Sequence, residues 1–92
     1  MGFLRRWRDD APARRNRAEG TTCFYCGVVF QGVGREARTV DHRLAKSRGG
    51  HDGLANVVFA CRACNDRKAD SLEEDFLGSD WLRRRRGGLD EG

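Results

Sequence analysis

The chain has 92 residues, of which 38% are hydrophobic and 35% are charged. This length supports one small domain, and a domain of this size buries only about 60% of the surface that its unfolded chain exposes. We therefore expect something other than apolar packing to help hold the fold together. No stretch approaches the length of a transmembrane helix, and the N-terminal MGFLRRWRDD lacks the apolar run of a signal peptide. These absences favour a cytoplasmic protein with reduced thiols.

The net charge of +4 is unevenly distributed along the chain. Residues 1–20 carry a net charge of +3, residues 83–92 carry +2, and residues 21–82 carry −1. Basic segments on both sides of a nearly neutral middle favour a polyanion such as nucleic acid as the partner. The competing interpretation is that arginine-rich tails only keep the protein in solution.

The first predicted segment is a basic, weakly ordered N-terminal arm at residues 1–20. Its apolar periodicity is low and Pro12 interrupts it, although Phe3, Leu4 and Trp7 would share one face of a short helix. The last segment, residues 79–92, is predicted to be a basic C-terminal tail. The folded domain is then expected to span residues 21–78.

Inside that domain the sequence alternates between short apolar runs and glycine-rich loops. We expect a cysteine knuckle at residues 21–30, a short strand at 37–40, a loop with three glycines between residues 49 and 56, and a second strand at 57–60. A helix is predicted over residues 62–69.

A further helix is expected to begin near Ser71, because Ser71 and Glu74 form an S-x-x-E capping box. Gly78 is the expected end of this helix. The final SDWLRRRRGG is predicted to hold one or two helical turns that end at Gly87.

The four cysteines form two C-x-x-C pairs, which predict a metal site. Cys23 and Cys26 precede a gap of 34 residues, and Cys61 and Cys64 follow it. In a reducing compartment two such pairs indicate structural Zn²⁺ rather than disulfides, with a redox motif or an iron centre as the alternative. Zinc binding can contribute on the order of 10 kcal/mol to folding. The ion would clamp the two ends of a hairpin-like insert.

Within that insert, Asp41 and His42 stand where the first strand gives way to a loop. Asn65 follows the last cysteine, at the first turn of the predicted helix. Carboxylate and amide oxygens are hard ligands that suit Mg²⁺ or Mn²⁺, and an imidazole near pH 7 can accept a proton from water. Successive strand residues point to opposite faces, so the strand must end or bulge at this pair, or the two side chains must approach from different sides.

The ordered set of these residues resembles the HNH endonucleases in their zinc-clamped form. The resemblance covers residues 23–68 and includes VDH, then Asn56 fourteen residues after His42, then CRACNDRK. It implies a small α+β fold with a ββα-metal core. It also implies His42 as the general base, Asp41 and Asn65 as ligands of a catalytic Mg²⁺ or Mn²⁺, and Asn56 as the residue that holds the histidine-bearing loop.

The resemblance further implies hydrolysis of phosphodiester bonds in DNA. A domain of this size offers little surface for reading bases, so we expect weak sequence preference unless a protein partner or second subunit supplies specificity. Lys68, Arg43 and Arg48 are the predicted phosphate contacts, each with an ordinary solvated residue as the alternative. Small members of the family occur in phages and bacteria, which agrees with a cytoplasmic location. The alternative function is a zinc-stabilised nucleic-acid-binding module without catalysis.

Overall fold

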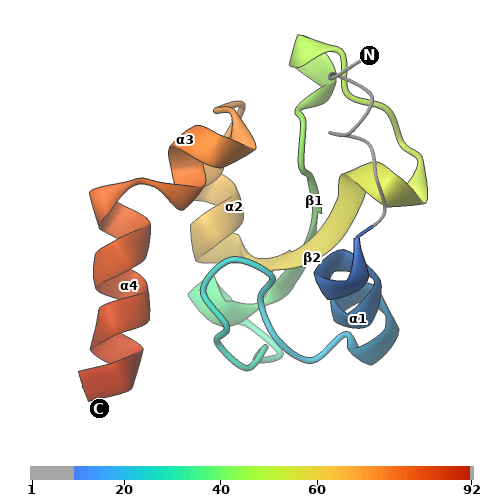
Figure 1. Ribbon diagram of the computed structural model, residues 1–92. Coiled ribbons are helices and arrows are strands. Elements are labelled where there is room, and N and C mark those ends of the chain that lie inside the picture. Colours follow the sequence, from blue (N-terminus) through green and yellow to red (C-terminus); the bar gives the residue numbers. More distant parts are fainter. Residues whose placement is uncertain (1–9, 92) are drawn as a thin grey trace.

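Two short antiparallel strands form the centre of the structure, a computed structural model that describes residues 10–91. Strand β1 (Arg38–His42) pairs with β2 (Val57–Cys61) in a regular register that ends with His42 opposite Val57. Helix α2 (Arg62–Lys68) follows β2 directly and packs against the hairpin (Figure 1). This hairpin followed by a helix confirms the predicted ββα arrangement.

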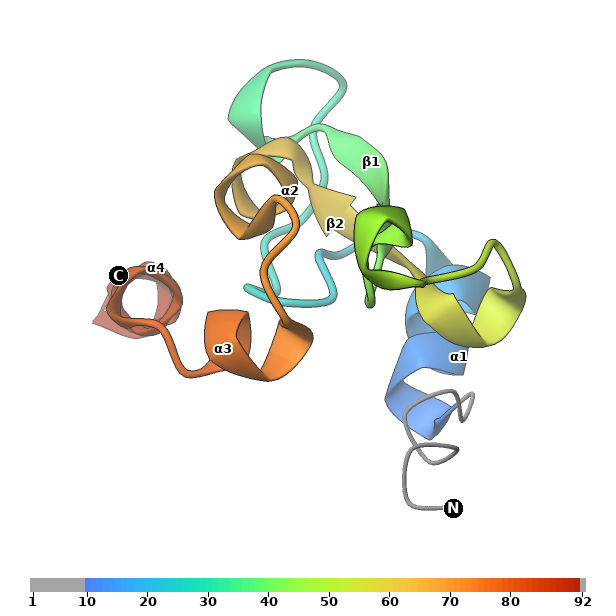
Figure 2. The same cartoon turned by 90° about the horizontal axis from the view of Figure 1, so that it is seen from above.

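The other helices lie around this unit. They are α1 (Ala11–Glu19), α3 (Glu73–Leu77) and α4 (Asp80–Glu91), and three short 3₁₀ turns occupy Gly34–Glu36, Lys46–Arg48 and Leu54–Asn56. Helices α1 and α4 lie on opposite sides of the hairpin, as both views show (Figures 1 and 2). None of the helices within residues 10–91 has the length and apolar character needed to cross a membrane.

Helix α1 lies within the segment that the sequence predicts to be a weakly ordered arm, and the described part of that segment forms a regular helix. Asp10 caps the helix by accepting a hydrogen bond from the amide of Ala13 at 2.9 Å, and Gly20 ends it in a left-handed conformation. Pro12 stands in the first turn, where its missing N–H costs no helical hydrogen bond. The proline therefore starts this helix instead of interrupting it. The predicted helix at Phe3, Leu4 and Trp7 lies outside the described residues.

Asn16 attaches α1 to the outer edge of the hairpin. Its amide oxygen accepts from Phe59 N at 2.7 Å, and its nitrogen donates to the carbonyls of Thr22 at 2.9 Å and Phe59 at 3.2 Å. Arg17 donates to the carbonyl of Val57 at 2.8 Å. Since a free strand edge exposes unpaired backbone groups, these contacts protect β2 from pairing with another chain.

The C-terminal helices differ from the predictions in two details. The N-cap residue of α3 is Leu72, with no capping bond from its side chain, so the predicted Ser71–Glu74 box does not start this helix. Gly78 ends α3 as predicted. Helix α4 continues through Gly87, because an isolated glycine inside a helix costs only about 1 kcal/mol relative to alanine and does not by itself stop it.

All four cysteines lie in the hydrophobic core. Around them, the ring of Tyr25 packs edge-on against Phe76 with centroids 5.2 Å apart. The buried hydrophobic residues are Ala13, Cys23, Tyr25, Cys26, Val58, Ala60, Cys61, Ala63, Cys64, Phe76 and Leu82. Four of these eleven residues are cysteines, so the stability of the core depends on what holds their sulfur atoms together.

Candidate metal centre and active site

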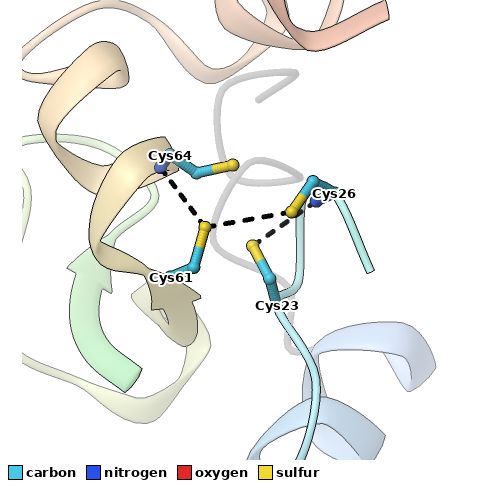
Figure 3. A group of neighbouring side chains, drawn as sticks. All are labelled: Cys23, Cys26, Cys61 and Cys64. Atoms are coloured by element: carbon cyan, nitrogen blue, oxygen red, sulfur yellow. Dashed lines mark hydrogen bonds between the residues drawn. The ribbon is translucent and has the colours of Figure 1, made fainter. Parts of the chain in front are cut away.

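The four cysteine sulfurs converge on one point between the knuckle and the start of α2 (Figure 3). They lie within 4.8 Å of one another, and all four cysteines are buried, free thiols. The Sγ atoms of Cys26 and Cys61 are 3.8 Å apart. A tetrahedral zinc site with Zn–S bonds of about 2.3 Å needs sulfurs about 3.8 Å apart. The predicted four-cysteine cluster is confirmed, and its donor set suggests structural Zn²⁺.

Backbone amides support the sulfurs in the same way in both pairs. The amide of Cys26 donates to Cys23 Sγ and the amide of Cys64 donates to Cys61 Sγ, each at 3.4 Å. Such bonds favour the thiolate form that metal binding needs. Hydrogen bonding led by Cys23 lowers the pKa of Cys26 and lowers that of Cys61 to about 6, whereas it raises the pKa of Cys64. Ionisation of some thiols therefore makes the others harder to ionise, and a bound cation would stabilise all four as thiolates.

Asp41 lies at the end of β1 with its carboxylate almost enclosed. Oδ2 accepts a hydrogen bond from the Tyr25 hydroxyl at 2.6 Å and lies 3.4 Å from Lys68 Nζ. Lys68 is fully buried and also donates to the carbonyl of His42 at 3.0 Å. Burial raises the pKa of Asp41, and the contacts with Tyr25 and Lys68 partly oppose this rise. Both contacts use Oδ2, so Oδ1 is the carboxylate atom that remains for a metal ion.

His42 is half-buried and has a carboxylate partner that the sequence analysis did not identify. Its Nε2 lies 2.8 Å from Oδ1 of Asp52, and Oδ2 of Asp52 lies 3.2 Å from Lys46 Nζ. The hydrogen bond with His42, together with Lys46, lowers the pKa of Asp52. With Nε2–H donating to this carboxylate, Nδ1 is the nitrogen of a neutral ring that can accept a proton.

Asp41, His42 and Asn65 line the same open pocket, which has a volume of about 210 Å³. Strand β1 ends at this pair without a bulge, so the two side chains reach the pocket from different faces of the strand end. Asn65 donates from Nδ2 to Thr39 Oγ1 at 2.9 Å and to the carbonyl of Val40 at 3.1 Å. These bonds fix its side chain through the nitrogen and leave the amide oxygen for a metal ion.

Asn56 is buried beneath the loop that joins the strands. Its Oδ1 accepts from the amide of Leu44 at 2.8 Å, and its Nδ2 donates to the carbonyls of Leu44 and His51, each at 2.9 Å. The carbonyl of Asn56 accepts from Arg43 N at 2.7 Å. One side chain thus ties both halves of the loop to the residues immediately after His42.

The three predicted phosphate contacts occupy other positions in the free protein. Lys68 is enclosed beside Asp41, as described above, so it presents no surface to a phosphate. Arg43 makes a forked pair with Glu73, at 2.7 and 3.2 Å, and a second pair with Asp10 at 3.2 Å. Arg48 is exposed and donates to the carbonyl of Asp70. The exposed cation that lines the pocket is Lys46, which the sequence analysis did not select.

Two other residues of the site were also missed. Tyr25 lies between the first two cysteines, where only its placement in three dimensions connects it to Asp41. Asp52 follows His42 by ten residues in a glycine-rich loop. Neither residue belongs to a recognisable local motif. For Asp52, however, an acidic residue in the loop that follows a candidate base is itself a signal for a histidine partner.

The fold and the site together define a ββα-metal domain clamped by four cysteines. Residues 23–71 match the family model described as HNH endonuclease, which is more than half of the 92 residues, and the chain belongs to this family. Membership implies a nucleic-acid substrate. Searches of curated proteins and of solved structures gave no match.

Proposed function

We propose that this protein is a metal-dependent DNA endonuclease that hydrolyses phosphodiester bonds with His42 as the general base. The observation that carries the proposal is the common pocket, to which β1 contributes Asp41 and His42 and α2 contributes Asn65. A proton acceptor and two hard oxygen ligands are the groups that such a hydrolysis needs at one place.

His42 would take the proton from the attacking water at Nδ1. The bond from Nε2 to Asp52 selects this tautomer and orients the ring. Asp52 is therefore proposed as the positioning partner of the base. Asn56 would hold the loop that carries this contact in place through its three side-chain hydrogen bonds.

Asp41 and Asn65 would hold the catalytic cation through Asp41 Oδ1 and the Asn65 amide oxygen. Bound Mg²⁺ or Mn²⁺ would supply Lewis-acid stabilisation of the charge that develops on the phosphate oxygens. Lys46 is the proposed phosphate contact, because it is exposed, lines the pocket and is held beside His42 by Asp52. An exposed lysine on a short 3₁₀ turn can exchange this surface ion pair for a phosphate at little cost.

One observation favours a second function, the non-catalytic zinc-stabilised nucleic-acid-binding module. The ammonium of Lys68 already lies 3.4 Å from Asp41 and compensates its charge without a metal ion. A buried pair of this kind is costly to separate. In the catalytic account the pair persists and the cation uses the other carboxylate oxygen, whereas in the alternative account no cation binds there.

The test is a plasmid-nicking assay on the zinc-loaded full chain, with Mg²⁺ or Mn²⁺ added back to metal-depleted buffer and the zinc content measured in parallel. We expect cleavage only with the added metal. His42→Ala should reduce it by about 10²- to 10⁴-fold, with unchanged zinc content and unchanged DNA affinity. Salt-sensitive DNA binding without nicking in any divalent metal would establish the binding module instead.

A further inference from the structure

The guanidinium of Arg85, on α4, contacts the metal centre from outside. Its Nε lies 3.3 Å from Cys26 Sγ, and its Nη2 lies 3.6 Å from Cys61 Sγ. These two cysteines belong to different C-x-x-C pairs. One planar group therefore bridges the knuckle and the start of α2 at the sulfurs that would bind the ion.

The charge of the site explains why a cation belongs there. Four thiolates and one Zn²⁺ carry a net charge of −2, in a core where that charge is poorly solvated. An arginine guanidinium stays protonated in proteins, so Arg85 brings a positive charge to the sulfurs of Cys26 and Cys61. Hydrogen bonds between charged groups are roughly twice as strong as neutral ones.

Helix α4 is attached to the knuckle by neighbouring residues as well. Leu82 is fully buried in the core that contains the cysteines, and Arg86 donates to the carbonyl of Tyr25 at 2.6 Å. Arg85 also lies 3.7 Å from Glu36, a surface pair at the edge of this contact. The helix thus rests on the segment whose shape the metal ion would fix.

We propose that Arg85 hydrogen-bonds the zinc-bound thiolates of Cys26 and Cys61, and that this contact couples zinc binding to the docking of α4. Outer partners of metal ligands commonly change metal affinity by about 10- to 100-fold. Because coupling between two binding events is reciprocal, zinc in turn holds the arginine-rich helix on the domain. The sequence block Arg83–Arg86 is therefore divided: Arg85 is half-buried against the cysteines, while the other three arginines are exposed, and of these Arg86 donates to the knuckle.

The experiment compares zinc affinity in single variants of the full chain by competition with a chromogenic chelator. Arg85→Gln should bind zinc about 10- to 100-fold more weakly than the wild type. Arg84→Gln is the matched control, since it removes the same charge from the exposed neighbouring position and should change the affinity less than twofold. Glu36→Gln separates the sulfur contact from the surface ion pair and should also have little effect.

A second readout follows the helix itself. In the zinc-loaded proteins, amide hydrogen exchange over residues 80–87 should be faster in Arg85→Gln than in Arg84→Gln. If Arg85→Gln does not fold, Arg85→Lys takes its place, because lysine keeps the charge and loses the two-pronged geometry; it should still weaken zinc binding. Equal zinc affinity and equal exchange in the Arg85 and Arg84 variants would overturn the proposal.

Discussion

The Nε2 atom of His42 and the Oδ1 atom of Asp52 lie 2.8 Å apart, across a loop in which ten positions separate the two residues. This contact assigns different tasks to the two ring nitrogens, with Nε2 held by the carboxylate and Nδ1 left as the acceptor. It joins the proposed base to the loop that Asn56 ties to the residues after His42 and in which Gly50 lies close to the carbonyl of Leu44. The loop is therefore part of the site as much as the strand that carries His42.

Asp52→Asn should slow cleavage without lowering DNA affinity or zinc content, because the variant also frees Lys46 from its ion pair. The amide can still accept a hydrogen bond but no longer offers a negative charge to the protonated imidazole, so we expect a loss of roughly 10- to 100-fold in rate. Asp52→Glu should recover part of this loss. The measurement is single-turnover cleavage beside DNA binding. A variant that lost affinity and kept its rate would show that Asp52 positions Lys46 and not the base.

Asn56→Ala should destabilise the protein, because it removes three side-chain hydrogen bonds to the backbone of Leu44 and His51. Each such bond contributes about 0.5–1.5 kcal/mol. Denaturant unfolding of the zinc-loaded protein gives the free energy directly. Asn56→Asp keeps the acceptor and loses both donors, so it should be destabilised as well; a stability equal to the wild type in both variants would contradict the structural role.

Gly50→Ala should deform the same loop. A Cβ at this position would lie 1.8 Å from the carbonyl oxygen of Leu44, a distance that the backbone can relieve only by moving. Gly32→Ala is the matched control, since nothing lies within 4 Å of its added Cβ and its φ is not in the left-handed region. We expect Gly50→Ala to lose more than about 1 kcal/mol of stability and most of the cleavage, and Gly32→Ala to be neutral or slightly stabilised.

Tyr25→Phe should shift the pH dependence of cleavage. Burial is the largest effect on Asp41 and raises its pKa, while the Tyr25 hydroxyl lowers it by donating to the carboxylate. Removing the hydroxyl therefore raises the pKa of Asp41 further, so the ionised form that would bind the cation is lost at a higher pH. The acid limb of the pH–rate profile should move to higher pH, and more Mg²⁺ should be needed at a given pH. An unchanged acid limb would show that Asp41 does not limit the rate.

Patterns over short distances predicted much of this fold. The spacing of the cysteines predicted the metal cluster, and short apolar runs near glycine-rich loops predicted β1 and β2. Pairings over long distances were not accessible in the same way. A sequence gives the charge of Arg43 and Lys68 but not their ion pairs with Glu73 and Asp41, which lie far away along the chain.

The helices at the two ends show how local rules mislead when the boundary is placed wrongly. Pro12 breaks a helix only when it stands beyond the first turn, and here Asp10 caps the helix two residues ahead of the proline. Gly87 was expected to end α4, yet the helix continues through it. The contacts of Leu82, Arg85 and Arg86 with the core and the knuckle stabilise this helix, and none of them is visible in the periodicity of its own sequence.

Removing the structural metal should unfold the domain rather than merely inactivate it. Cys61 is the clearest position for the test, because it caps α2, ends β2 and contributes a sulfur to the cluster. Zinc binding of this kind contributes on the order of 10 kcal/mol, which exceeds what a core of this size can supply alone. Cys61→Ser should therefore lose zinc and helical circular dichroism together. Since the ligands must be thiolates, protons compete with the metal, and stability should fall as the pH is lowered. A metal-free protein that kept its helical signal and a cooperative unfolding transition would show that packing alone holds the fold.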